Sequence, residues 1–178
     1  MTTHQKKTAI VTGASQGIGA GLVEAFLKLG YNVVGNSRNI TKTNPFPASV
    51  NLALIDGDIG DPKTAARIVD TAVSRFGQVD VLINNAGIFI PKPFTEYTTE
   101  DLNALVSTTL AGFLYVSQLS EKALASSWKN SRNPCCQVFF QRIADLSVSS
   151  RRKLHRAQPL LQQLVFFEKR VTQSFAFR

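Results

Sequence analysis

The chain has 178 residues and a mass of 19.5 kDa; 44% of its residues are hydrophobic, 18% are charged, and the formal net charge is +8. This length suits one domain with an appendage, and the composition excludes a wholly disordered, collagen-like or membrane-spanning chain. The charge is uneven, because residues 1–126 carry ten Lys/Arg and ten Asp/Glu, whereas residues 127–178 carry ten Lys/Arg and two acids. All 11 glycines lie at or before Gly112. We therefore divide the chain near residue 126.

Short apolar runs and helical patterns alternate over the first part of the chain. Residues 8–12 form a β-rich run that ends at Gly13 and predicts a first strand. Apolar residues then recur at helical spacing until Gly30, which suits the left-handed position after a helix. Residues 31–36 predict a second strand, and residues 51–56 predict a third.

A second helix and a fourth strand follow. Asp61 is typical of a helix N-cap, and Pro62 after it suits the first helical position. Apolar residues at helical spacing continue until Gly77, which suits the end of this helix. Residues 79–83 then predict an apolar fourth strand.

The next predicted helix begins with a capping box. Thr98 is followed three residues later by Asp101, and this spacing lets each side chain bond the backbone N–H of the other residue. Helical spacing places mostly apolar residues on one side of this helix. That side is formed by Leu102, Leu105, Val106, Thr109, Phe113 and Val116.

This order of strands and helices predicts an α/β fold. Near-continuous apolar strands are typical of parallel pairing with helices on both faces. Right-handed crossovers favour a Rossmann-type doubly wound parallel sheet, here partial, with strand order 3-2-1-4. We assign residues 1–126 to this truncated domain. We interpret residues 127–178 as an atypical basic tail that is irregular, disordered or translated out of frame.

The turn after the first predicted strand carries the pattern Gly13-x-x-x-Gly17-x-Gly19. Gly13 lets the chain turn off the strand, Gly17 permits the close approach of a pyrophosphate, and Gly19 lets the helix lie near the sheet. The N–H groups and dipole at the helix N-terminus favour an anion. A turn without a ligand would also fit the pattern, but its position between a strand and a helix favours nucleotide binding.

A second motif, Asn84-Asn85-Ala86-Gly87, follows the fourth predicted strand. With these two motifs the chain resembles the short-chain dehydrogenase/reductase family over residues 8 to about 125. The resemblance implies an NAD(P)-dependent oxidoreductase that transfers hydride between the cofactor and a small-molecule carbonyl or alcohol substrate. It also implies that the Asn-Asn-Ala-Gly turn lies against the ribose and nicotinamide of the dinucleotide cofactor.

The end of the second predicted strand bears on the choice of cofactor. A carboxylate there would hold the adenosine 2′-hydroxyl of NAD, but this chain has Asn36-Ser37-Arg38. Arg38 offers a permanently charged donor fork that suits a 2′-phosphate, as in NADP-preferring members of the family. We therefore expect NADP rather than NAD; an ordinary solvated arginine is the alternative interpretation.

The end of the third predicted strand carries the residues that would contact adenine. Asp58-Ile59 matches the position where the family uses a carboxylate and a neighbouring backbone N–H. Asp56 and Asp61 lie close by, so the acid concerned stays open, although Asp61 is better explained as a helix cap. The predicted cofactor-binding residues are Gly13, Ser15, Gln16, Gly17, Ile18, Gly19, Ser37, Arg38, Asp58, Ile59, Asn85, Ala86 and Gly87.

The proton-transfer residues of the family have no match in this chain. The family's chemistry needs Tyr-x-x-x-Lys, in which a lysine one helical turn away lowers the pKa of the tyrosine that exchanges a proton with the substrate oxygen. Tyr31, Tyr97 and Tyr115 are the only tyrosines, and none is followed four positions later by a lysine. We assign no catalytic residue and expect this chain to be catalytically incompetent. The alternative function is a non-catalytic dinucleotide-binding fragment.

The basic tail offers a further alternative, an interaction protein that binds nucleic acid. Its Lys and Arg side chains could contact phosphates, and the interleaved Phe and Gln could stack on bases. However, the tail carries no recognisable RNA-binding motif, and runs of charge are usually solvated. Cys135 and Cys136 lack the spacing of metal ligands, so we expect no metal site.

Cysteine usage and hydropathy bear on the location of the protein. Two adjacent cysteines cannot form a disulfide framework, so we expect a reducing compartment, the cytoplasm. No apolar run approaches the roughly 18 residues that a membrane helix needs, and the first residues do not resemble a secretory signal. We therefore expect no membrane partner.

Overall fold

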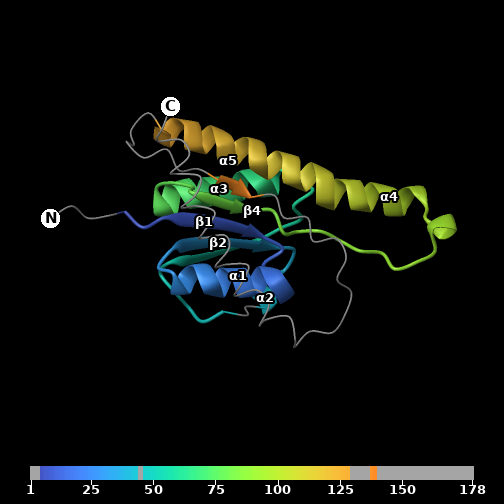
Figure 1. The fold of residues 1–178 in the computed structure, drawn as a ribbon, viewed down its shortest axis with the longest axis horizontal. Coiled ribbons are helices and arrows are strands. Elements are labelled where there is room, and N and C mark those ends of the chain that lie inside the picture. Colours follow the sequence, from blue (N-terminus) through green and yellow to red (C-terminus); the bar gives the residue numbers. More distant parts are fainter. Residues whose placement is uncertain (1–4, 44–45, 129–136, 140–178) are drawn as a thin grey trace, which may run out of the picture. The chain divides into compact units, whose positions relative to one another are not determined.

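The computed structural model describes residues 5–43, 46–128 and 137–139 (Figure 1). Its centre is a parallel sheet with the strand order β3-β2-β1-β4-β5. The order 3-2-1-4 predicted from the sequence is therefore confirmed, and a fifth strand extends it. The strands are β1 (Thr8–Thr12), β2 (Asn32–Ser37), β3 (Leu52–Asp56), β4 (Val81–Ile83) and β5 (Gln137–Phe139).

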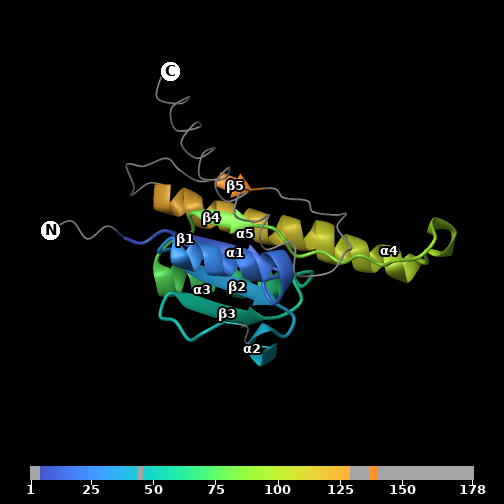
Figure 2. The same cartoon turned by 60° about the horizontal axis from the view of Figure 1, so that its bottom comes forward.

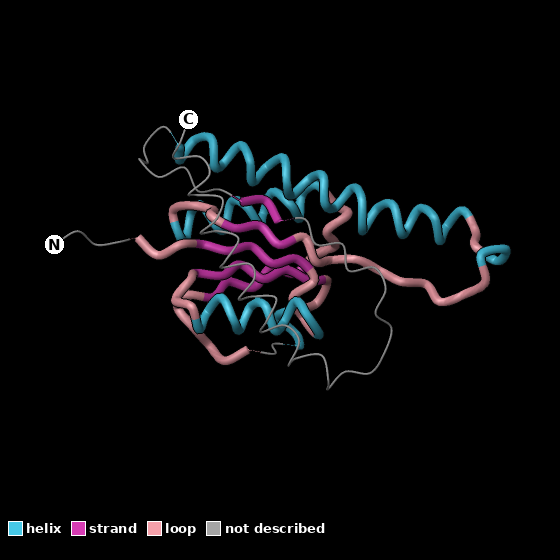
Figure 3. Tube along the Cα trace, viewed as in Figure 1, coloured by secondary structure: helices cyan, strands magenta, loops and turns pink. Residues whose placement is uncertain are grey.

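Helices cover both faces of the sheet, as in a doubly wound fold (Figures 1 and 2). One face packs against α1, whereas α3 packs on the other face and in turn contacts α5. A long loop leads from β4 out to the beginning of α4 (Figure 3). The helices are α1 (Gly17–Lys28), α2 (Ile40–Thr43), α3 (Pro62–Phe76), the 3-10 turn η1 (Phe94–Glu96), α4 (Thr99–Leu105), the π-helical segment η2 (Val106–Ala111) and α5 (Gly112–Trp128).

Helix ends lie where the local sequence predicted them. Asp61 is the N-cap of α3, and its carboxylate accepts a hydrogen bond of 3.0 Å from the Lys63 N–H. Gly30 and Gly77 follow α1 and α3 with φ of +84° and +85°, a conformation that glycine adopts without steric cost. These ends depend on neighbouring residues alone, which is why the sequence predicts them.

The capping box at the start of α4 is also confirmed. The Thr98 hydroxyl accepts from the Asp101 N–H, and the Asp101 carboxylate accepts from the Thr98 N–H at 2.8 Å. The Lys92 ammonium forms an ion pair with the same carboxylate. The Lys92 ammonium and the hydrogen bonds from Thr98 hold the pKa of Asp101 below its ordinary value. The loop after β4 is thereby fixed to the beginning of the helix.

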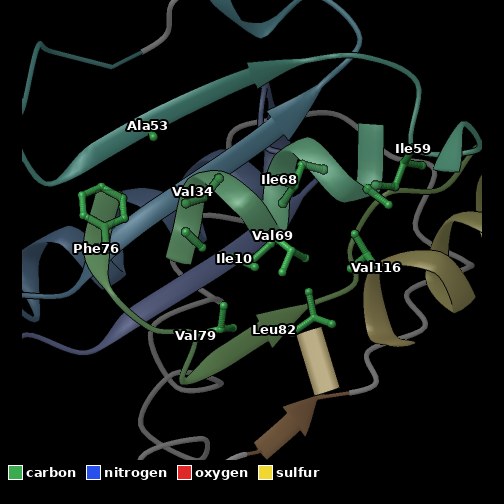
Figure 4. Close-up of a cluster of buried hydrophobic side chains, with 12 residues drawn as sticks. Ile10, Val34, Ala53, Ile59, Ile68, Val69, Phe76, Val79, Leu82 and Val116 are labelled. Carbon is green, nitrogen blue, oxygen red and sulfur yellow. The ribbon is translucent and has the colours of Figure 1, made fainter. Parts of the chain in front are cut away.

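The main core lies between the sheet and α3 (Figure 4). Ile10 and Val34 of the sheet pack against Ile68 and Val69 of α3, and all four are almost fully buried. Val116 of α5 closes the same cluster and is completely buried. The core therefore reaches the second half of the α4–α5 helix.

The apolar side predicted for the α4–α5 helix is buried only in its second half, because Val116 is completely buried whereas Leu102 and Val106 are exposed. Leu102 and Leu110 are 57% and 62% exposed, and Val106 and Leu114 are exposed as well. The reason is position, because α4 extends past the end of the sheet, where no described element covers it (Figure 1). We call Leu102, Val106, Leu110 and Leu114 the exposed stripe.

One helix among the described residues passes a test of length and hydropathy for a membrane span. It runs from Thr99 to Ala123, and an 18-residue window within its 25 residues has a mean hydropathy of 1.2. The sequence showed no continuous apolar run there, because polar residues are interspersed. Helices of soluble proteins pass the same test, and α5 packs against α3 through Val116, so this helix is only a weak indication of a membrane function.

The edge of the sheet differs from the expectation that it ends at the fourth strand. β5 pairs with β4 in parallel, with Val81 opposite Gln137 and Ile83 opposite Phe139. A short strand from the range assigned to the tail therefore covers the edge of β4. The described residues belong to a compact unit, Met1–Leu146. Residues 129–136 and 140–178 lie outside the described residues, so their interpretation as a disordered or out-of-frame tail stays a prediction.

We expect the double substitution Leu102→Gln and Leu110→Gln to reduce self-association of the protein. Both side chains are more than half exposed, and exposed apolar side chains that lie near one another promote contact with another molecule. Light scattering at increasing protein concentration measures the effect, and the urea midpoint should stay unchanged.

Val50→Gln is the matched control, because Val50 is 83% exposed and lies outside the exposed stripe. It should leave the scattering unchanged. Equal scattering from the double variant and the wild-type protein would contradict the prediction.

Candidate functional site

A pocket of about 310 Å³ lies where the turns after β1, β2, β3 and β4 meet. The carboxyl ends of parallel strands lie at the same edge of a sheet, which is the usual place of a ligand in this class of fold. Eleven of the thirteen predicted cofactor-binding residues line the pocket. They are Gly13, Ser15, Gln16, Gly17, Ser37, Arg38, Asp58, Ile59, Asn85, Ala86 and Gly87.

The turn from Gly13 to Gly17 forms one wall of the pocket. Gly17 has a φ of +59°, and a Cβ added there would meet nothing within 4 Å, so the backbone lies open toward the pocket. Helix α1 begins at this residue, and its N-cap, Gln16, makes no capping hydrogen bond with its side chain. The first N–H groups and the helix dipole favour an anion at this point. The wall therefore fits a pyrophosphate.

The other two predicted residues of this turn, Ile18 and Gly19, are not among the lining residues. A Cβ on Gly19 would lie 2.2 Å from the Gly13 carbonyl oxygen and 2.7 Å from Asn85 Nδ2. Any larger residue would therefore push α1 away from the sheet. Gly19 therefore contributes by letting α1 pack close to the sheet, which is the role expected of it from the sequence.

Asn85 joins the turn after β4 to the turn after β1. Its side-chain Nδ2 donates to the carbonyl oxygens of Thr12 and Gly13 at 3.0 and 3.1 Å. The backbone N–H groups of Asn85 and Ala86 also donate, at 3.1 and 3.0 Å, to the Thr12 hydroxyl. Asn84 donates to the Ser117 hydroxyl at 3.1 Å and so connects the same turn to α5. These bonds hold two walls of the pocket together.

Of the three candidate acids, only Asp58 lines the pocket. Its Oδ1 accepts from the Gly60 N–H at 2.9 Å. Asp56 accepts instead from the hydroxyl and the backbone N–H of Thr41, and these two hydrogen bonds lower its pKa below the ordinary value. Asp61 caps α3. The geometry thus separates three acids that the sequence left as alternatives.

The end of β2 brings Ser37 and the exposed Arg38 to the pocket. Ser37 donates a hydrogen bond of 3.0 Å to the Ser15 hydroxyl, which connects this end to the glycine turn. Asn36 is buried, and its Nδ2 donates to the carbonyl oxygens of Ile55 and Gly57 at 2.9 and 3.2 Å. Arg38 is therefore the charged side chain that the end of β2 presents to the pocket.

Four lining residues were not predicted from the sequence: Asn36, Gly57, Ile88 and Thr108. Asn36, Gly57 and Ile88 adjoin predicted residues, so extending each motif by one position would have found them. Thr108 lies on the helix after the long loop that follows β4, and no local pattern marks it as part of a site.

The three tyrosines, all within the described part of the chain, lie outside the pocket lining. Tyr31 packs against Phe26 with ring centroids 5.2 Å apart, and Tyr97 donates to the Ile90 carbonyl oxygen at 2.6 Å. Tyr115 packs against the main core. Over residues 5–43, 46–128 and 137–139, no three His, Cys, Asp or Glu side chains gather as metal ligands would.

Known proteins resemble this chain over the same region. The family profile described as short chain dehydrogenase matches residues 7–131. A sorbitol dehydrogenase of Cereibacter sphaeroides is 30% identical over 131 residues, which are 71% of this chain and 50% of that protein. A tropinone reductase homolog of Arabidopsis thaliana is 33% identical over 127 residues, 68% of this chain and 48% of that protein.

A solved structure extends the comparison to three dimensions. The 3-ketoacyl-(acyl-carrier-protein) reductase from Brucella melitensis, complexed with NADH, has a TM-score of 0.68 and 25% identity, and the match covers 74% of this chain and 55% of that one. The chain spans about half the length of the curated relatives that it matches. The family profile nevertheless covers both the glycine turn and the Asn-Asn-Ala-Gly turn that form the pocket, and the chain belongs to the short-chain dehydrogenase family.

Proposed function

We propose that the pocket binds the dinucleotide NADP(H), the cofactor with which an active member of the family would move hydride between a carbonyl and an alcohol. The observation that carries this proposal is the connection of the two turns. Asn85 bonds the backbone of Thr12 and Gly13, which brings the open wall at Gly17 and the turn after β4 to one pocket. The Brucella melitensis reductase, similar in fold and family, holds NADH.

Each wall would hold a different part of the cofactor. The N-terminus of α1, beginning at Gly17, would hold the pyrophosphate through N–H groups and the helix dipole. Asp58 and the Ile59 N–H would contact adenine, and the turn through Asn85 and Gly87 would lie against the ribose and nicotinamide. When bound, the nicotinamide supplies the hydride chemistry.

The end of β2 supports NADP over NAD. A carboxylate at this position would hold the ribose 2′-hydroxyl and repel a 2′-phosphate. Here the lining residues are Asn36, Ser37 and Arg38, none of which is acidic, and the Asn36 amide already donates to the carbonyl oxygens of Ile55 and Gly57. The guanidinium of Arg38 can form two hydrogen bonds with a phosphate.

We further propose that this chain binds the cofactor without turning over a substrate. Proton transfer to a carbonyl oxygen needs a general acid within hydrogen-bond reach of it. Tyr31, Tyr97 and Tyr115 lie outside the pocket lining, and none has a lysine four positions on. We also propose a cytoplasmic location, because two adjacent cysteines fit a reducing compartment.

We expect Arg38→Ala to weaken NADPH binding roughly ten-fold, because a charge-assisted hydrogen bond to the 2′-phosphate is lost. NADH binding should change less than two-fold. Titration of NADPH and NADH fluorescence, or calorimetry, measures both affinities.

Lys42→Ala is the control, because Lys42 is an exposed cation on α2 outside the pocket. It should leave both affinities unchanged. An equal loss for NADPH and NADH on Arg38→Ala would show that Arg38 does not read the 2′-phosphate.

We expect no oxidation of NADPH above the uncatalysed rate when the purified chain is mixed with simple ketones and aldehydes. The reason is that none of the three tyrosines lines the pocket or has a lysine four positions on. The measurement is NADPH absorbance, under conditions in which a titration has shown that NADPH binds. Turnover proportional to protein concentration would overturn the proposal that the chain is inactive.

A further inference from the structure

Two neighbouring asparagines fix the turn after β4 to two different elements. Asn85 bonds the end of β1 through the carbonyl oxygens of Thr12 and Gly13. Asn84 bonds α5 instead, because its Nδ2 donates to the Ser117 hydroxyl at 3.1 Å. Asn84 and Ser117 are both half-buried, and neither lines the pocket. Their hydrogen bond therefore acts on the turn from outside the pocket.

Helix α5 is held in place by contacts other than this bond. It begins at Gly112, directly after the π-helical turn Val106–Ala111. A Cβ on Gly112 would lie 2.7 Å from Ile59 Cγ2 and 3.1 Å from the Ile59 carbonyl oxygen, so the helix starts in direct contact with the turn after β3. Val116, the residue before Ser117, is completely buried in the main core. The helix is therefore a fixed support from which Ser117 can hold the turn after β4.

The part of this turn that lines the pocket depends on hydrogen bonds more than on packing. The Asn85 N–H donates to the Ile83 carbonyl oxygen at 3.1 Å, so the chain turns sharply at the residue between them, and residues 86–88 then line the pocket. Gly87 is exposed. Apart from its chain neighbours, a Cβ on Gly87 would have the Thr109 hydroxyl, 3.9 Å away, as its nearest contact. The bonds of the two asparagines thus fix the start of a segment that packing leaves open.

We propose that Ser117 is a positioning residue, which holds Asn84 and thereby sets residues 86–88 against the nicotinamide half of the dinucleotide. The inference rests on the proposed function and deepens it. The nicotinamide half is the one affected, because the adenosine half would be held by Arg38 and Asp58 on other turns. Without the Ser117 hydroxyl, the partly buried Asn84 amide loses an acceptor, and a lost partner of this kind costs free energy.

The test compares Ser117→Ala, which removes the hydroxyl, with Ser117→Thr, which keeps it. Calorimetry measures the affinity of each variant for NADPH and for 2′,5′-ADP, which lacks the nicotinamide half. Ser117→Ala should weaken NADPH roughly three- to ten-fold, as expected for one lost hydrogen bond, and should change the affinity for 2′,5′-ADP less than two-fold. Ser117→Thr should bind both ligands within two-fold of the wild-type protein.

Ser120→Ala is the matched control on the same helix. Ser120 is completely buried, and its hydroxyl has no hydrogen-bond partner among the described residues. This variant loses the same atom as Ser117→Ala from a position three residues further along α5, so it controls for the effect of the substitution on the helix. It should leave both affinities unchanged, and an equal loss of NADPH affinity in the two variants would overturn the role of Ser117.

Asn84→Ala removes the same hydrogen bond from its other side. It should weaken NADPH by the same factor as Ser117→Ala, and the double variant should lose no more than either single variant, because the two residues act through one bond. It also replaces Ser117→Ala in the test if that variant does not fold in a thermal melt. Additive losses in the double variant would contradict the proposal.

The outcomes separate this proposal from the proposed function. Failure of the wild-type protein to bind NADPH would refute the proposed function itself. Normal binding of NADPH by both the wild-type protein and Ser117→Ala would refute only the positioning role. An equal loss for NADPH and 2′,5′-ADP in Ser117→Ala would show a general structural role and would refute the specific effect on the nicotinamide half.

Discussion

The hydrogen bonds between Asn85 and the end of β1 are the constraint on which the pocket depends. The Asn85 side-chain amide donates to the carbonyl oxygens of Thr12 and Gly13. The Thr12 hydroxyl accepts from the backbone N–H groups of Asn85 and Ala86. Backbone groups that are partly buried at the ends of strands need such partners, since unpaired ones are costly. The same bonds that complete the sheet therefore bring together two turns that are far apart in the sequence.

Close packing around these bonds leaves little freedom in the choice of residues. Gly19 lies against the Gly13 carbonyl oxygen and the Asn85 amide, so the helix that begins at the pocket can approach the sheet only with a hydrogen at that position. On the other side, Gly60 and Gly112 allow the turn after β3 to approach the π-helical turn. Glycine backbone thus forms part of the pocket lining, and the N–H groups and dipole at the start of α1 suit a charged ligand better than an apolar one.

Local rules explain why much of the fold and site could be predicted. The N-cap Asp61, the capping box at Thr98 and the left-handed Gly77 each depend on residues within a few positions. The apolar side predicted for the helix from Leu102 to Val116 shows where such rules fail. Helical spacing identified the residues that share a side, but burial requires a neighbour, and only the half of the helix that includes Val116 lies against α3.

The sequence by itself determined the alternation of strands and helices, the strand order 3-2-1-4 and the two motifs that identify the pocket, because each depends on periodicity, turn residues and the handedness of crossovers. Only the tertiary structure decided which acid faces the pocket, that β5 covers the edge of β4, and that Thr108 joins the lining. Asp56, Asp58 and Asp61 are the same residue type, and they differ in the hydrogen-bond partners that folding brings to each carboxylate. No periodic pattern in the sequence predicts long-range contacts of this kind, because they form only when distant parts of the chain pack together.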